Sequence, residues 1–199
     1  MEYTLAGIGE SLLEVKKSRF LGFAYSASSE EECKRILKNL QKRFHDATHI
    51  VYCIRLGYGG KYEYFTDSGE PSGTAGAPIM RILKGQKISN AMVAVVRYFG
   101  GIKLGTGGLV KAYSQTARNA IEDAGIIPFI EMVEIEAKIP YGAVSQMAIL
   151  IDKTGGTITS QDFSEIVTIK ARIPKNAINE LQSFISEITR GKEIFKIKD

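Results

Sequence analysis

The sequence has few cysteines and no long apolar run. Its two cysteines, Cys33 and Cys53, form neither a CxxC pair nor a zinc-type spacing, so we interpret them as reduced thiols. No apolar run reaches the roughly 18 residues that a transmembrane helix needs, and the N-terminal segment lacks the apolar stretch of a secretory signal. These absences exclude a disulfide scaffold and predict a cytoplasmic protein that does not act in a membrane.

The rest of the composition is that of an ordinary globular chain. The 199 residues are 44% hydrophobic and 24% charged, close to the average for soluble domains. A chain of this length holds one large domain or two small ones. We therefore expect packed domains rather than a disordered or collagen-like chain.

Acidic residues are absent from one long stretch. None occurs between Pro71 and Ile121. The same stretch holds seven basic residues, namely Arg81, Lys84, Lys87, Arg97, Lys103, Lys111 and Arg118. Residues 1–130 hold 17 Lys/Arg and 12 Asp/Glu, whereas residues 131–199 hold 9 and 10. A polyanion or a phosphate group is the natural partner of such a segment, although solvated surface lysines would produce the same pattern.

The first 127 residues predict a sheet covered by helices. Ser28 or Ser29 before three glutamates marks a helix start, because a hydroxyl caps it and the acids face its positive end. Periodicity predicts strands at 10–15, 19–25, 49–56, 62–66 and 90–99, a short helix at 77–83, a loop at 100–108 and a helix at 109–124. The order is ββαββαβα, which is an α+β arrangement.

The chain after the Gly125–Pro128 segment has a pattern of its own. Strands are predicted at 131–139, 157–163, 166–173 and 193–198, and helices at 141–153 and 175–189. This βαββαβ order is that of a ferredoxin-like domain. We therefore expect two domains, 1–127 and 128–199.

Glycine marks a candidate binding site. Of 20 glycines, 12 lie between Gly57 and Gly108. In RYFGGIKLGTGG, residues 97–108, a buried strand runs into a glycine loop and then a helix, whose free N–H groups bind phosphate well. The candidate phosphate- or nucleic-acid-binding residues are Arg97, Gly100, Gly101, Lys103, Gly105, Thr106, Gly107, Gly108, Lys111 and Arg118. Neither a Walker A loop nor a GxGxxG unit is present, and tight packing at a crossover is the alternative explanation.

A second loop, DSGEPSGTAG at 67–76, supplies carboxylates and hydroxyls. Asp67 and Glu70, together with His49, are candidate acid/base or cation-binding residues. Turn formation explains the same residue types equally well. His45 and His49 lack a third ligand at a suitable spacing, so we assign no metal and expect no cofactor.

These motifs resemble the YigZ/IMPACT family. The resemblance rests on KSRF at 17–20, ATH at 47–49, the 67–76 loop and, most specifically, VRYFGGIKLG at 96–105 followed by GGL at 107–109. It implies an N-terminal domain like domain 2 of ribosomal protein S5 and a ferredoxin-like C-terminal domain, a pair similar to the last two domains of the translocation elongation factor. Eukaryotic members regulate translation by binding the activator of the amino-acid-starvation kinase.

Together these observations predict a nucleic-acid- or ribosome-associated binding protein with a role in translation. RNA or the ribosome would contact the basic, glycine-rich face of the N-terminal domain. The alternative is a hydrolase- or phosphotransferase-type enzyme acting on a small phosphorylated or nucleotide substrate, with the anion at Gly105–Gly108. A protein–protein regulator of translation is the third possibility. A pocket in which the candidate residues converge, with a ligand or phosphate bound, favours the enzyme, whereas an open basic face favours the binding protein.

Overall fold

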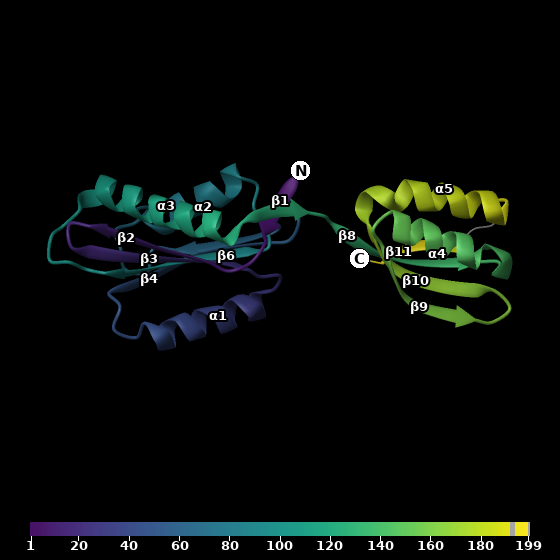
Figure 1. Ribbon diagram of the computed structural model, residues 1–199, viewed down its shortest axis with the longest axis horizontal. Helices are drawn as coiled ribbons and strands as arrows, with labels where there is room; N and C mark the ends of the chain where they lie inside the picture. The colour runs from purple at the N-terminus through teal and green to yellow at the C-terminus, as the bar shows by residue number, and fades with distance from the viewer. Residues whose placement is uncertain (192–193, 199) are drawn as a thin grey trace. The chain divides into compact units, whose positions relative to one another are not determined.

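The computed structural model describes residues 1–191 and 194–198. Contacts divide the chain into two compact units, Met1–Phe129 and Ile130–Asp199, and both combine strands with helices (Figure 1). The fold is therefore mixed α+β. Within the described ranges, no helix is long and apolar enough to cross a membrane.

The first unit is built on a five-stranded antiparallel sheet. Its strands in spatial order are β2 (Gly9–Val15), β3 (Ser18–Ser26), β6 (Ala91–Tyr98), β4 (His49–Leu56) and β5 (Tyr62–Thr66). The central strand β6 is buried from Ala91 to Arg97, as its nearly continuous apolar sequence predicts.

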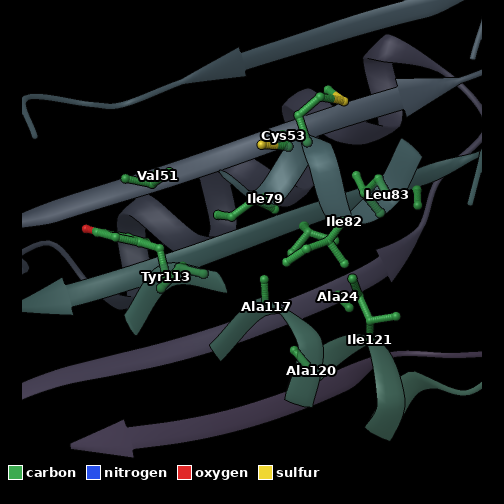
Figure 2. Close-up of a cluster of buried hydrophobic side chains, with 14 of the residues drawn as sticks. Ala24, Val51, Cys53, Ile79, Ile82, Leu83, Tyr113, Ala117, Ala120 and Ile121 are labelled. Atoms are coloured by element: carbon green, nitrogen blue, oxygen red, sulfur yellow. The ribbon is translucent and has the colours of Figure 1, made fainter. Parts of the chain in front are cut away.

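Helices cover both faces of this sheet. The helices α2 (Gly76–Gly85) and α3 (Gly105–Ala124) lie on one face, and α1 (Glu30–Arg43) lies on the other (Figure 1). Figure 2 shows the larger core, between the sheet and the α2–α3 layer. Alternate residues of β6 serve the two layers: Val93 and Val95 pack toward α2 and α3, whereas Ala94 and Val96 pack toward α1.

The predicted helix starts are confirmed for α1 and corrected for α3. Ser29 caps α1, because its Oγ accepts a hydrogen bond from the Glu32 N–H at 3.2 Å. The predicted loop at 100–108 is too long, since α3 already begins at Gly105. Burial of the following turns, from Leu109 onward, outweighs the low helix propensity of the glycines.

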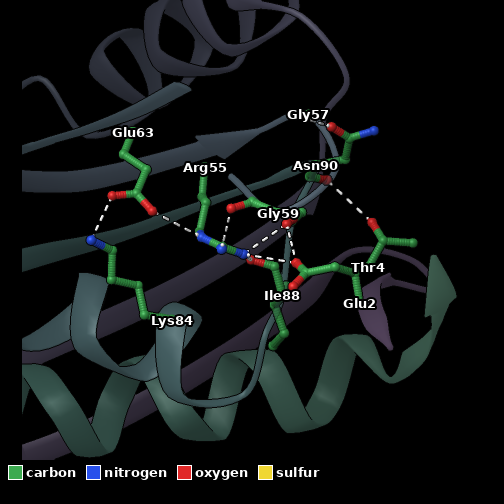
Figure 3. A network of polar contacts seen from close by, with 10 residues as sticks. Glu2, Thr4, Arg55, Gly57, Gly59, Glu63, Lys84, Ile88 and Asn90 are labelled. Carbon is green, nitrogen blue, oxygen red and sulfur yellow. Dashed lines mark hydrogen bonds and ion pairs between the residues drawn. The ribbon is translucent and has the colours of Figure 1, made fainter. Parts of the chain in front are cut away.

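A two-stranded sheet was not predicted. It pairs β1 (Glu2–Leu5) with β7 (Ile126–Phe129) in antiparallel register. Each strand has only four residues, too few for periodicity to reveal them. Figure 3 shows how Arg55 fixes β1: its Nη1 donates to Glu2 Oε2 at 3.1 Å, while its Nε donates to Glu63.

The second unit has the predicted βαββαβ order. Its elements are β8 (Met132–Ile139), α4 (Val144–Lys153), β9 (Thr157–Phe163), β10 (Val167–Pro174), α5 (Ile178–Thr189) and β11 (Ile194–Lys198). The sheet order is β11-β8-β10-β9, all antiparallel. A single 3₁₀ turn precedes each helix, at Tyr141–Ala143 and Lys175–Ala177. The predicted start of the last strand, Glu193, lies outside the described residues.

Candidate functional site

Three side chains lie in a row near one end of the first sheet. Arg97 on β6 is the register partner of Phe20 on β3 and of His49 on β4. Directly opposed residues share one face of a sheet, and here it is the face covered by α3. Phe20 packs edge-on against Tyr113 of α3, with ring centroids 5.2 Å apart. The Arg97 guanidinium carbon lies 5.3 Å from the centroid of the Phe20 ring.

The 67–76 loop carries Glu70 to this row. Its Oε1 lies 2.6 Å from Nη1 of Arg97 and accepts a second hydrogen bond from the Tyr113 hydroxyl at 2.7 Å. The Glu70 and Arg97 side chains are only 3% and 6% exposed, so each needs the other to compensate its charge. Burial and the bond to Glu70 raise the pKa of Tyr113. Tyr113 therefore stays protonated and acts as a donor.

His49 borders the same group with a defined tautomer. Its Nδ1 lies 2.8 Å from the carbonyl oxygen of Ser68. A carbonyl only accepts, so Nδ1 carries the proton and Nε2 is the acceptor nitrogen of the neutral ring. That Nε2 lies 3.9 Å from Glu70 Oε1. His49 thus offers the site a nitrogen able to accept a hydrogen bond or a proton.

Of these residues, His49, Glu70 and Arg97 form part of the wall of a pocket of about 450 Å³, here named the α3 pocket. Its lining residues are Thr48, His49, Glu70, Pro71, Arg97, Phe99, Lys103, Leu104, Gly105, Thr106 and Leu109. The volume lies in the range of small-ligand pockets, roughly 300–1,000 Å³. Six residues predicted from the sequence converge here: His49, Glu70, Arg97, Lys103, Gly105 and Thr106.

Asp67 has a different role from Glu70 and His49, with which the sequence groups it. Its carboxylate accepts hydrogen bonds from the backbone N–H groups of Gly73, Ala75 and Gly76 at 2.7–3.0 Å. Burial raises the pKa of Asp67, but the three donors together outweigh burial and hold this pKa below its usual range. Asp67 therefore fastens the loop to the start of α2, while Glu70 and His49 face the pocket.

The predicted glycines differ in how much space surrounds them. A Cβ on Gly100 would lie 2.0 Å from the backbone carbonyl carbon of Lys17, so this glycine permits the close approach of the β2–β3 turn. Gly105 has φ +73°, which glycine adopts without strain. Around Gly101 and Gly107 a Cβ would meet nothing within 4 Å.

The remaining predicted residues lie on a second surface. Gly108, Lys111 and Arg118 line a pocket of about 620 Å³, and Arg118 also lines one of about 400 Å³ with Arg81. We name the exposed side chains Arg81, Lys111 and Arg118 the α2–α3 basic face. Among the described residues, none of the three forms an ion pair.

Sequence reasoning missed the internal partners of this site. The sequence predicts Arg97 as a phosphate contact, whereas in the structure Arg97 donates to Glu70, which also accepts from Tyr113. A usable signal exists, since Arg97 ends a strand whose apolar residues predict burial, and buried charges need partners. In the described part of the chain, no group of three or more His, Cys, Asp or Glu side chains is arranged to hold a metal ion.

Comparison with known proteins identifies both units. Residues 16–121 match the Impact N-terminal domain, and residues 139–192 match a domain of unknown function, DUF1949. The IMPACT family member YvyE of Bacillus subtilis is 28% identical over 98% of this chain and 89% of its own length. The IMPACT family member YigZ of Escherichia coli is 30% identical over 89% of this chain and 88% of its own.

A solved structure matches the whole chain. The crystal structure of a hypothetical protein aligns with a TM-score of 0.72 and 28% sequence identity, covering 100% of this chain and 98% of the other. The two-unit architecture is therefore shared with a protein of nearly the same extent.

Proposed function

Because this chain belongs to the IMPACT family, we propose that it binds RNA as a ribosome-associated cytoplasmic protein with a role in translation. The α2–α3 basic face would carry the contact. The family resemblance supports the link to translation, since its eukaryotic members regulate that process. The proposal assigns binding rather than catalysis to this face.

The observation that carries the proposal is the charge of the α2–α3 layer. Arg81, Lys111 and Arg118 are exposed, and the sequence supplies no acidic residue between Pro71 and Ile121 to neutralise them. Phosphate contacts from such side chains provide the sequence-independent part of nucleic-acid affinity.

The spacing of these cations suits a chain of phosphates. Lys111 and Arg118 are seven residues apart on α3, which is about 10 Å along the helix axis. They therefore meet different phosphates of an extended ligand rather than one phosphate group. Arg81 extends the positive surface onto α2.

We further propose specific fold relationships for the two units. The second unit supports a ferredoxin-like assignment, because its βαββαβ order and its antiparallel β11-β8-β10-β9 sheet follow that pattern. The first unit is proposed to resemble domain 2 of ribosomal protein S5. A pair of domains related to those of the translocation elongation factor would suit a ribosomal partner.

Fluorescence anisotropy with a single-stranded ribosomal RNA fragment and with duplex DNA tests the proposal. Lys111→Ala and Arg118→Ala should each weaken RNA binding and lower the log–log salt slope by about 0.7–0.9. Lys38→Ala is the matched control, because Lys38 is an exposed lysine of α1 on the opposite face of the sheet. Absent RNA binding, or equal effects of all three variants, would overturn the proposal.

A further inference from the structure

Two buried arginines of the first unit differ in whether all their guanidinium nitrogens have hydrogen-bond partners. Every guanidinium nitrogen of Arg55 has a partner: Nε donates to Glu63, Nη1 to Glu2 and Nη2 to the carbonyl of Gly59 (Figure 3). Arg97 is also buried, at 5% exposure, and its Nη1 donates to Glu70. Its Nε, however, has no partner, the one such buried side-chain nitrogen or oxygen in the described part of the chain.

An unpartnered buried donor costs free energy unless something supplies an acceptor. Arg55 shows that this unit satisfies a buried guanidinium where its role is structural. Arg97 lines the α3 pocket, so the missing acceptor is expected from that side. The unsatisfied nitrogen indicates a ligand carrying oxygen acceptors.

The helix that opens onto the same pocket lacks a cap. Ser29 caps α1, and Asp67 accepts from the backbone at the start of α2. The N-cap of α3 is Leu104, without a side-chain cap bond, and the first turn of α3 contains no acidic residue. Gly105 and Thr106 line the pocket, so unpaired N–H groups and the positive helix end are available to an anion.

The pocket wall combines this positive end with an apolar side. Lys103 adds an exposed positive charge, while Glu70 offsets that of Arg97. Phe99 is 46% exposed, and Leu104 and Leu109 line the pocket beside it. A ligand that suits both sides has an anionic group joined to an apolar or aromatic one.

We propose that the α3 pocket binds a small phosphomonoester. Its phosphate oxygens accept from Arg97 Nε, from the first-turn N–H groups of α3 and from Lys103, and the rest of the molecule lies against Phe99. Arg97 lies at the phosphate end of the ligand, and its bond to Glu70 fixes the position of its guanidinium group. His49 Nε2 accepts from a ligand hydroxyl.

This site is separate from the proposed RNA contact. The α3 pocket is lined by Lys103, whereas the α2–α3 basic face is formed by Arg81, Lys111 and Arg118, and none of these three lines the α3 pocket. Failure of one proposal therefore leaves the other intact.

Isothermal titration calorimetry at constant ionic strength, with AMP, adenosine and glycerol 3-phosphate as probes, tests the proposal. AMP should bind, adenosine should bind at least about tenfold more weakly because it lacks the phosphate, and glycerol 3-phosphate should fall between them. Lys103→Ala should weaken AMP about tenfold, whereas the matched Lys111→Ala should leave it unchanged.

Three results would overturn the proposal. One is the absence of AMP binding, and another is adenosine binding as tightly as AMP. The third is an equal loss in Lys103→Ala and Lys111→Ala, which would indicate general attraction to surface charge. Glycerol 3-phosphate binding as tightly as AMP would contradict the role given to Phe99. Both lysines are exposed, so neither variant threatens the fold.

Discussion

Arg97 and Glu70 form a buried ion pair that joins β6 to the 67–76 loop, with Nη1 2.6 Å from Oε1. The pair fixes one wall of the α3 pocket, and the Tyr113 hydroxyl bonds to the same carboxylate oxygen from α3. Strand, loop and helix therefore meet at one carboxylate. Residues 97–108 and the 67–76 loop are separate segments of the sequence, yet they contribute to a single site.

The Glu70→Gln variant tests how much the buried pair stabilises the first unit. It leaves the Arg97 charge buried without a counter-ion, so we expect the free energy of unfolding to fall by about 3–5 kcal/mol. Glu10→Gln is the control, because its 3.6 Å pair with Arg43 is more than half exposed, and such pairs contribute about 0–1 kcal/mol. Urea unfolding measures both. Equal losses in the two variants would contradict the role of burial.

Asp67 makes the stability of the fold dependent on pH. Its pKa is lowered from 3.8 in the folded protein, so its contribution is present above pH 3.8 and is lost as the pH falls through the folded value. Asp67→Asn should cost about 1–3 kcal/mol at neutral pH, because three backbone donors lose a charged acceptor.

The difference between wild type and Asp67→Asn should shrink in acid. Urea unfolding from about pH 7 down to about pH 3 measures it, with Asp162→Asn, an exposed site on β9, as the control. A difference that stays constant across this range would show that the Asp67 charge is not the stabilising feature.

Alanine substitutions in the 100–108 segment distinguish a glycine that packs tightly against the backbone from one that faces open space. Gly100→Ala forces a Cβ to within 2.0 Å of the Lys17 backbone, and overpacking of this kind costs about 1–3 kcal/mol. Gly107→Ala meets open space within α3 and should stabilise the helix by about 0.5–1 kcal/mol. Thermal unfolding distinguishes the two. Similar melting temperatures would mean that Gly100 does not fit tightly against the turn.

Local patterns in the sequence were sufficient to predict most elements. The Ser29 cap of α1 and the βαββαβ order of the second unit follow from nearest-neighbour chemistry and periodicity, and the structure confirms them. Three features depend on contacts between distant residues. These are the β1–β7 pair, the early start of α3 and the ion pair between Arg97 and Glu70. Periodicity cannot reveal them, because none has a signal within one segment.

The candidate site was predicted only in part for the same reason. The sequence identified the residues of the glycine motif and the acidic loop, and six of them line one pocket. It did not separate Lys103, at the pocket, from Lys111, which lies two turns along α3 on the basic face. That separation depends on the helix starting at Gly105.

Both proposals together give the first unit two distinct anion-binding surfaces, the α3 pocket and the α2–α3 basic face. Amide and arginine Nε chemical shifts of ¹⁵N-labelled protein test it most directly, first with AMP and then with a short RNA at constant ionic strength. We expect AMP to shift the signals of Thr106 and of Arg97 Nε, and RNA to shift those around Arg81, Lys111 and Arg118. The same set of signals moving with both ligands, or none moving with either, would contradict this expectation.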